Sequence, residues 1–449
     1  MQSSLSVPLL AGCRTPVAPR HGALRHHTPL TLAAPLVQHL LQTVGLPPDA
    51  VDTLILGNAL GAGGNPARMT ALAAGLPQRC ATFSVDTQCC SGLDAINLAA
   101  ARILSGQSDV VIAGGAEAWT RSPIRQHRPM DATQAAIPYE RPAFTPWPAR
   151  DPDPLQAAAD YAARHGFTRH QQDEYARDSH ARDSHARAVR AMAARSACTP
   201  SAILPLEGLL HDAYPRLLSE RQASRMPVAA RAPTDTHSPD ASDPDCALSR
   251  LAISPQADGA ALVLMASAEF CARHGIAPAA HWLGGLSLGA DPDNPLTSAL
   301  AATEALMQRQ QLDLHVLHAV ELHDAFAVQG LAFQQALHGK GLDPARVNAW
   351  GGGLARGHPI GASGAIALVE LLARLHAPHA PYAASTTAGM PERPENSEIP
   401  AAPSSAPHQN HPDMPGTKTA STPRHSLLGL ACIAGVGGLG SAALVAAHR

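Results

Sequence analysis

The chain has 449 residues, 45% of them hydrophobic, so it can bury a large core and is long enough for two or three domains. Thirty-three basic residues against 36 acidic ones leave a formal net charge of −3. A chain this close to neutral offers no electrostatic attraction to nucleic acid or to an anionic membrane. Eight cysteines without a repeated spacing and without a CxxC pair indicate a reduced cytoplasmic protein with no zinc site.

Two apolar segments, one near each end, could be mistaken for membrane signals. "LLAGC", ending at Cys13, resembles a lipoprotein cleavage box, but no Lys or Arg precedes it and Pro8 interrupts a very short apolar run. Residues 427–447 are as long as a membrane span, but they are rich in Gly and Ala and contain a cluster of glycines. We therefore predict a first strand at the former and a buried pair of strands around a glycine loop at the latter.

The stretch "ATFSVDT" alternates apolar and polar residues, which is the period of a strand. From Ser91 the apolar residues recur on one helical face until Gly106, and "DVVIAGG" then follows as a short apolar strand. A strand, helix, strand unit predicts a parallel sheet covered by helices, so the expected fold class is α/β.

A similar unit occurs late in the chain, in "VNAWGGGLARGHPIGASGAIALVELLARL". Aligning Ser91 and Gly92 with Ser363 and Gly364 pairs apolar with apolar positions along both predicted helices. This internal echo suggests two halves that are built alike.

Residues 121–250, between the halves, are rich in Pro, Arg, Asp and His and contain helical stretches at 155–165 and 171–195, which predicts an inserted loop domain. Within it "ARDSHARDSH" repeats five residues in tandem. Five extra residues rotate a helix by about 140°, so the duplication is predicted to be tolerable only on a solvated helix, and it is given no function. Residues 378–425 are poor in apolar residues and rich in Pro, Ser, Thr and His, which predicts disorder.

Adjacent cysteines in "VDTQCCSG" lie where the strand pattern changes to the helix pattern. A thiol at a helix N-terminus can have a lowered pKa, so Cys89 is a candidate nucleophile, although a buried and inert thiol fits the position equally well. His358, in the glycine-rich "GLARGHPIGASG", could be its base or could be structural. Cys432, which opens "CIAGVGGLG", and His323, which opens "HDAFA", are further candidates.

The segments "VDTQCCSGLDAI", "VIAGGAEAW", "VELHDAFA", "VNAWGGGLARGHPIGASG" and "GLACIAGVGGLGSAA" resemble the successive signatures of the thiolase family, in the family's order. The resemblance covers nearly the whole chain outside the proline-rich interruption. It implies a layered αβαβα fold made of two similar halves. The first half would span 1–120 and be completed by 251–270, a CoA-binding loop domain would span 121–250, and the second half would span 271–449 with the insertion at 378–425.

The resemblance also implies a chemistry. Cys89 would attack a thioester carbonyl and form an acyl-enzyme, while Cys90 would occupy a position of small neutral residues. His358 would activate Cys89 and, with His323, hold the enolate oxygen of a second thioester. Cys432 would move the proton at the nucleophilic carbon of acetyl-CoA.

Backbone N–H groups of Cys89 and of the glycine loop, around Ala434, would form the oxyanion hole for the acyl-enzyme step. Ser254 would line the pantetheine tunnel. No metal or prosthetic group is implied; the substrates would be coenzyme A thioesters, and the protein would be a homodimer or homotetramer without a membrane or nucleic-acid partner.

Three departures from the family pattern accompany these matches. His323 stands where asparagine is usual, Leu251 and Ala252 replace glycine and asparagine, and the glycine loop after Cys432 is about two residues longer. The resemblance predicts an active thiolase that makes or cleaves 3-ketoacyl-CoA. Two alternatives stay open: a catalytically weak thiolase-derived protein that binds CoA esters, and a condensing enzyme of the ketoacyl synthase type.

Overall fold

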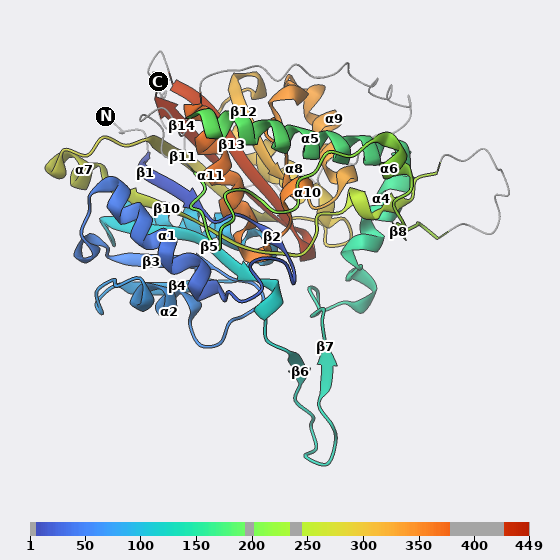
Figure 1. The fold of residues 1–449 in the computed structure, drawn as a ribbon, viewed down its shortest axis with the longest axis horizontal. Helices are drawn as coiled ribbons and strands as arrows, with labels where there is room; N and C mark the ends of the chain where they lie inside the picture. The colour runs from blue at the N-terminus through green and yellow to red at the C-terminus, as the bar shows by residue number, and fades with distance from the viewer. Residues whose placement is uncertain (1–5, 194–201, 234–244, 378–425, 449) are drawn as a thin grey trace, which may run out of the picture.

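A computed structural model of the chain describes residues 6–193, 202–233, 245–377 and 426–448. The segment predicted to be disordered, 378–425, lies outside the described residues. Figure 1 shows a layered body of strands and helices with one hairpin that extends away from it.

One mixed sheet runs through the body. Its strands follow the spatial order β12 (Leu317–His323), β13 (Ser426–Gly435), β14 (Leu439–His448), β11 (Ala280–Gly289), β1 (Val7–Arg14), β10 (Ala257–Ala266), β5 (Val110–Ala118), β3 (Thr53–Gly57) and β4 (Ala81–Val85), with β2 (Ala18–Pro19) paired to β10. β3 runs parallel to β4 and β5, and β12 runs parallel to β13, whereas the other neighbours are antiparallel. The predicted strand, helix, strand unit is confirmed.

Helices divide the body into layers. Two of them, α3 (Ser91–Leu104) and α11 (Ser363–His376), pack on each other between the strands of the two halves, and the core around them draws residues from both halves. The outer face of the first half is covered by α1 (Pro29–Val44) and α2 (Pro66–Ala73), and that of the second by α8 (Ser298–Arg309) and α9 (Ala327–His338). The expected α/β class and its layered architecture are confirmed (Figure 1).

The two central helices are alike, as the sequence echo suggests. Each has 14 residues and follows a 3-10 turn, η2 (Gln88–Cys90) before α3 and η9 (Ile360–Ala362) before α11. Their first turns touch so closely that a Cβ on Gly92 would lie 2.8 Å from the carbonyl oxygen of Gly361, and one on Gly364 would lie 2.7 Å from a side-chain carbon of α3. Glycine at both positions lets the two helix starts meet.

Both terminal apolar segments are strands, as predicted. β1 lies in the middle of the sheet, and β13 and β14 form a buried antiparallel pair joined through η10 (Val436–Gly438). Among the described residues, no helix is both long and apolar enough to cross a membrane.

The region between β5 and β10 forms the smaller part of the molecule. Its elements are η3 (Trp119–Arg121), β6 (Arg125–His127), β7 (Ile137–Tyr139), η4 (Pro148–Arg150), α4 (Pro154–His165), α5 (Arg169–Ala193), α6 (Glu220–Ser224), β8 (Val228–Ala230), β9 (Leu248–Ser249) and η5 (Arg250–Ala252). The two predicted helical stretches are α4 and α5, and β6 and β7 form the projecting hairpin (Figure 1). The remaining elements are α7 (Ala268–His274), α10 (Gly353–Arg356), η1 (Pro48–Ala50), η6 (Pro295–Thr297), η7 (Leu314–Val316) and η8 (Pro344–Arg346).

The tandem repeat lies in α5, but the prediction that it occupies a solvated helix is wrong. Ser179 and His180 of the first copy are buried, and so is Asp183 of the second. Because the helical period is 3.6 residues and the repeat is five residues long, the two copies turn different members inward. The helix therefore continues its buried face through the duplication.

Candidate active site

Cys89 lies in the turn that joins β4 to α3. The preceding residue, Gln88, has a φ of 56°, a left-handed conformation that is uncommon for a residue with a side chain. Cys89 is 7% exposed and lies among residues of the central core. The sharp turn thus places the thiol at the start of α3, where sequence reasoning expects it.

His358 reaches Cys89 from the loop between α10 and α11. Its Nε2 lies 3.3 Å from the Sγ of Cys89, and its Nδ1 lies 2.7 Å from the Oγ of Ser363. Because the Ser363 hydroxyl donates to the carbonyl oxygen of Pro359 at 3.1 Å, its oxygen accepts from Nδ1–H. The unprotonated nitrogen is then Nε2, the one that faces the thiol.

Burial sets the protonation of this pair. It raises the pKa of Cys89 to about 12 and lowers the pKa of His358 to about 4. Loss of water disfavours both charged forms, so at neutral pH the pair is a thiol hydrogen-bonded to a neutral imidazole. The expectation that the helix N-terminus lowers the pKa of Cys89 is wrong, because desolvation outweighs it.

Two backbone N–H groups, those of Val436 and of Cys89 itself, point at the Sγ of Cys89 and lower its pKa against the larger effect of burial. Val436 begins η10 in the glycine loop between β13 and β14. Ala434, the position expected for this contact, instead lies within β13 opposite Gly440 and packs against the outer core of the second half. The glycine loop does reach Cys89, two residues beyond the expected position.

His323 ends β12 and lies beside His358, with a distance of 4.3 Å between the ring centroids. It is 6% exposed, and burial, followed by the nearby His358 and Arg356, lowers its pKa well below the usual value. Its Nε2 has no hydrogen-bond partner among the residues that the structure describes. A Cβ on Gly353 would lie 2.6 Å from the ring, so a glycine there makes room for the imidazole.

Cys432 is not brought to this group. In the parallel pair of β12 and β13, Leu322 lies opposite Cys432, and both side chains belong to the outer core of the second half. Successive residues of a strand point to opposite faces, so His323 and Ile433 share the other face, which belongs to the central core with Cys89. Cys432 is fully buried and hydrogen-bonds to the side chain of Thr303 on α8.

Ser254 lies close to the site but contacts the protein's own backbone. Its Oγ donates to the carbonyl oxygen of Gly353 at 2.6 Å, and its N–H donates to that of Ala325 at 2.9 Å. Ala325 follows His323 by two residues, and Gly353 packs against the His323 ring. Ser254 thus joins the segment that carries His323 to the one that leads to His358.

Glu117 supports the His358 loop and was not singled out from the sequence. Its Oε2 accepts from the backbone N–H of Gly361 at 3.1 Å and of Ala59 at 2.8 Å, and its Oε1 accepts from the side chain of Asn58 at 2.6 Å. Burial raises its pKa to about 7. The available signal was a carboxylate inside the apolar strand "VIAGGAEAW", since a buried charge needs partners.

Known proteins resemble this chain over most of its length. Residues 7–196 match the family model for the thiolase N-terminal domain, and residues 276–390 match that for the thiolase C-terminal domain. "Putative acetyl-CoA C-acetyltransferase VraB" of Staphylococcus haemolyticus is 34% identical over 364 residues, which cover 80% of this chain and 90% of that protein. The chain belongs to the thiolase family. It is accordingly an acyltransferase.

Solved structures of thiolases have the same fold as this chain. An acetyl-CoA acetyltransferase of Bacillus anthracis superposes with a TM-score of 0.73 at 26% identity and covers 98% of each chain. The Acat5 thiolase of Ascaris suum, solved in complex with coenzyme A, shares the fold with a TM-score of 0.76 at 24% identity, covering 98% of this chain and 100% of that one. The two family-model matches end before residue 426, so Cys432 lies outside them.

The described residues of this thiolase contain neither a disulfide nor a metal-ligand cluster. Every cysteine within 6–193, 202–233, 245–377 and 426–448 is a free thiol. Those same ranges contain no cluster of three His, Cys, Asp or Glu side chains that could hold a metal ion.

The neutral thiol and imidazole predict how Cys89 responds to pH. Because the pKa of Cys89 is raised to about 12 and that of His358 is lowered to about 4, the thiolate fraction grows as pH rises and does not saturate near neutrality. Alkylation of Cys89 by iodoacetamide is expected to accelerate continuously from pH 6 to pH 9, measured by peptide mass spectrometry. A plateau with a midpoint near pH 6 or 7 would instead indicate a thiolate and imidazolium ion pair.

Ser363 is expected to fix the tautomer of His358. Replacing Ser363 by alanine removes the acceptor of Nδ1–H, so Nε2 would carry the proton for part of the time and fail as a base. We expect kcat to fall by about tenfold to a hundredfold, the range seen when an orienting partner of a histidine is lost, with little change in KM. Ser363→Thr retains the hydroxyl and should recover most of the loss; equal defects in both variants would argue against this role.

Proposed function

We propose that the chain transfers acyl groups between CoA thioesters through a thioester formed on Sγ of Cys89, and so makes or cleaves 3-ketoacyl-CoA. The observation that carries the proposal is the 3.3 Å contact between Nε2 of His358 and this Sγ. His358 would accept the thiol proton as Sγ attacks the carbonyl carbon. The N–H groups of Cys89 and Val436, which already point at Sγ, would donate to the oxyanion.

Cleavage of a 3-ketoacyl-CoA would need only these groups and His323. Attack on C3 breaks the bond between C2 and C3 and releases the enolate of acetyl-CoA, whose oxygen could accept from Nε2 of His323 and of His358. The proton that His358 took from Cys89 would then pass to C2. A second CoA thiol would give its proton to His358 and displace the acyl group from Sγ, and His358 would pass that proton to the departing Cys89 sulfur.

A direct assay tests the proposal. We expect acetoacetyl-CoA and free CoA to be converted to acetyl-CoA, followed by loss of the enolate absorbance, with an acetyl group on the peptide that contains Cys89. CoA-ester binding without turnover or label would support the thiolase-derived binding protein instead. A series of 3-ketoacyl chain lengths would then define the preferred substrate.

A condensing enzyme of the ketoacyl synthase type is the second candidate, and the place of Cys432 favours it. The site combines one thiol with two imidazoles, and the second thiol faces the other side of β13. An acylated Cys89 could therefore accept an enolate formed by loss of CO2, which needs no base at carbon. Condensation with malonyl-CoA but not with acetyl-CoA would identify this reaction, and Cys432→Ser should leave its rate unchanged.

Other expectations follow from the proposal. A thiol and two imidazoles can supply the acyl acceptor, the base and the enolate donors, so we expect turnover without a metal or prosthetic group. Dialysis against EDTA should leave kcat unchanged, and recovery of lost activity by added Zn²⁺ would contradict this.

We also expect a cytoplasmic homodimer or homotetramer, and light scattering of the purified protein would distinguish the two assemblies.

A further inference from the structure

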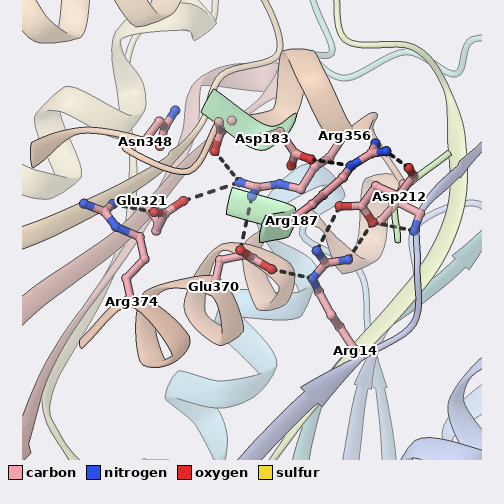
Figure 2. A network of polar contacts seen from close by, with 12 residues as sticks. Arg14, Asp183, Arg187, Asp212, Glu321, Asn348, Arg356, Glu370 and Arg374 are labelled. Carbon is pink, nitrogen blue, oxygen red and sulfur yellow. Dashed lines mark hydrogen bonds and ion pairs between the residues drawn. The ribbon is translucent and has the colours of Figure 1, made fainter. Parts of the chain in front are cut away.

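A cluster of charged side chains, all buried except the partly exposed Arg187, lies beside the active site. Figure 2 shows its hydrogen bonds and ion pairs, which join segments from both halves and from the region between them. Its members are the arginines Arg14, Arg187, Arg356 and Arg374 and the acids Asp183, Asp212, Glu321 and Glu370. Four cations thus meet four carboxylates, an arrangement in which removal of one member leaves a buried charge uncompensated.

Arg356 is at the centre of this cluster. Its Nη2 donates to the carbonyl oxygen of Gly351 at 2.8 Å and lies 3.4 Å from Oε2 of Glu321, while its Nη1 lies 3.4 Å from Oε2 of Glu370. Its side chain is 4% exposed. One guanidinium therefore ties together β12, α11 and the turn before α10.

Both histidines of the site follow a member of the Arg356 ion pair by two residues. Glu321 precedes His323 on β12, and because of strand alternation the two side chains lie on the same face. Arg356 ends α10 and precedes His358. The ion pair between Glu321 and Arg356 consequently bridges the two segments that bring the imidazoles to within 4.3 Å of each other.

Helix α5 supports the same two segments through residues spaced four apart. Tyr175 donates its hydroxyl to Asp324, next to His323, at 3.0 Å. Ser179 accepts from the backbone N–H of Gly352 at 2.9 Å. Asp183 packs against Gly351, whose carbonyl oxygen accepts from Arg356, and its carboxylate stabilises the charged form of that guanidinium. Asp183 belongs to the second copy of "ARDSH"; if one copy were deleted and the helix register kept from Tyr175, an alanine would stand at its position.

We propose that Arg356 and its direct ionic partners in this cluster, completed by Asp183 of the duplicated pentapeptide, position His323 and His358 relative to Cys89. Arg356 acts through the histidines and does not contact the reacting atoms. The duplication thereby gains a role, because in the register fixed by Tyr175 and Ser179 it supplies a buried carboxylate that an unduplicated helix would lack at this position.

Arg356→Lys and Arg356→Met test the proposal, which rests on the proposed function for its kinetic readout. Lysine keeps the charge but cannot reach Gly351, Glu321 and Glu370 together. We expect kcat to fall about tenfold in the lysine variant and about a hundredfold in the methionine variant, with KM changed less than about threefold, because misplaced catalytic groups slow the chemical step. Alkylation of Cys89 by iodoacetamide should slow in the same order.

The alkylation rate separates two failures, because it requires no turnover. If the wild-type protein lacks acyl transfer, the proposed function fails, yet slower alkylation of Cys89 in Arg356→Lys still supports the positioning role. Wild-type kcat and wild-type alkylation in folded Arg356→Lys would overturn it. Circular dichroism and the thermal midpoint establish that each variant is folded.

Asp178→Asn and Arg14→Met provide two matched controls, the first of them for a test variant at Asp183. Asp178 is the counterpart of Asp183 in the first copy of the repeat, and its side chain is 36% exposed, whereas that of Asp183 is fully buried. We expect Asp183→Asn to lower kcat severalfold and Asp178→Asn to leave it unchanged.

Arg14→Met removes a buried arginine of the same cluster that lies away from the histidines. A loss of kcat per folded molecule as large as that of Arg356→Met would overturn a specific positioning role for Arg356.

Discussion

Replacing Cys89 by serine is expected to lower kcat for acyl transfer by at least about a thousandfold, the scale on which loss of a nucleophile acts. The serine hydroxyl is a far weaker acid than a thiol, and the base that faces it, His358, has a pKa lowered to about 4. A base this weak cannot remove the proton of an alcohol efficiently. Initial rates of thiolysis, together with loss of the acyl label on the peptide that contains residue 89, measure the effect.

Cys90 provides the neighbouring control. It is 1% exposed, and its Sγ donates to the carbonyl oxygen of Ile433 at 3.8 Å rather than facing His358. Cys90→Ser is therefore expected to keep kcat within about threefold of the wild type, since a polar replacement inside the core affects stability before chemistry. An inactive Cys90→Ser alongside an active Cys89→Ser would reverse the assignment of the nucleophile.

Replacing Arg14 by methionine is expected to cost about 3–5 kcal/mol of the free energy of unfolding, as breaking a buried ion pair does. The Arg14 side chain is fully buried, 2.7 Å from Asp212 and 2.6 Å from Glu370. Methionine removes a cation from two buried carboxylates, although Glu370 still lies 3.4 Å from Arg356. The midpoint and slope of urea unfolding measure this loss.

An exposed arginine gives the comparison. The side chain of Arg273 is 53% exposed, and it pairs with Asp109 at 3.1 Å. Arg273→Met should change the free energy of unfolding by no more than about 1 kcal/mol, because water screens and competes for surface ion pairs. Similar losses in the two variants would show that burial of Arg14 does not control its contribution.

Periodicity and motif order predicted much of the fold. The change from alternating to helical spacing at Ser91 located β4, α3 and β5, and the glycine-rich end of the chain was correctly read as two strands. These features depend on local pattern, which the sequence carries directly. The grouping of Cys89, His358 and His323 was implied by the resemblance to the thiolase family, because local pattern alone left each residue with a structural alternative.

The position of Cys432 depends on where β13 ends. The strand continues to Gly435, so Cys432 is still inside the sheet and its direction is fixed by alternation. The motif gives the spacing between Cys432 and the glycines, but it does not indicate at which residue the strand ends. The same extension moves the N–H group that faces Cys89 from Ala434 to Val436.

Burial was the other quantity that local pattern did not provide. The raised pKa of Cys89 results from side chains that surround the finished turn, and the buried face of the tandem repeat results from the segments that α5 packs on. Ser363 and Glu117 were missed for a related reason: each acts by a hydrogen bond to a residue of the His358 loop, and only the folded backbone brings donor and acceptor together.

β13 and β14 lie inside the sheet although they come late in the sequence, so the sheet cannot be completed before they are synthesised. They are the last described segments in the chain, yet they fill the gap between β12 and β11. Until the ribosome has delivered residues 426–448, both of those strands expose an unpaired edge that can recruit other chains. Nascent or truncated chains that stop before this pair should therefore be substrates for chaperones and proteases, even though Cys89, His323 and His358 have already been synthesised.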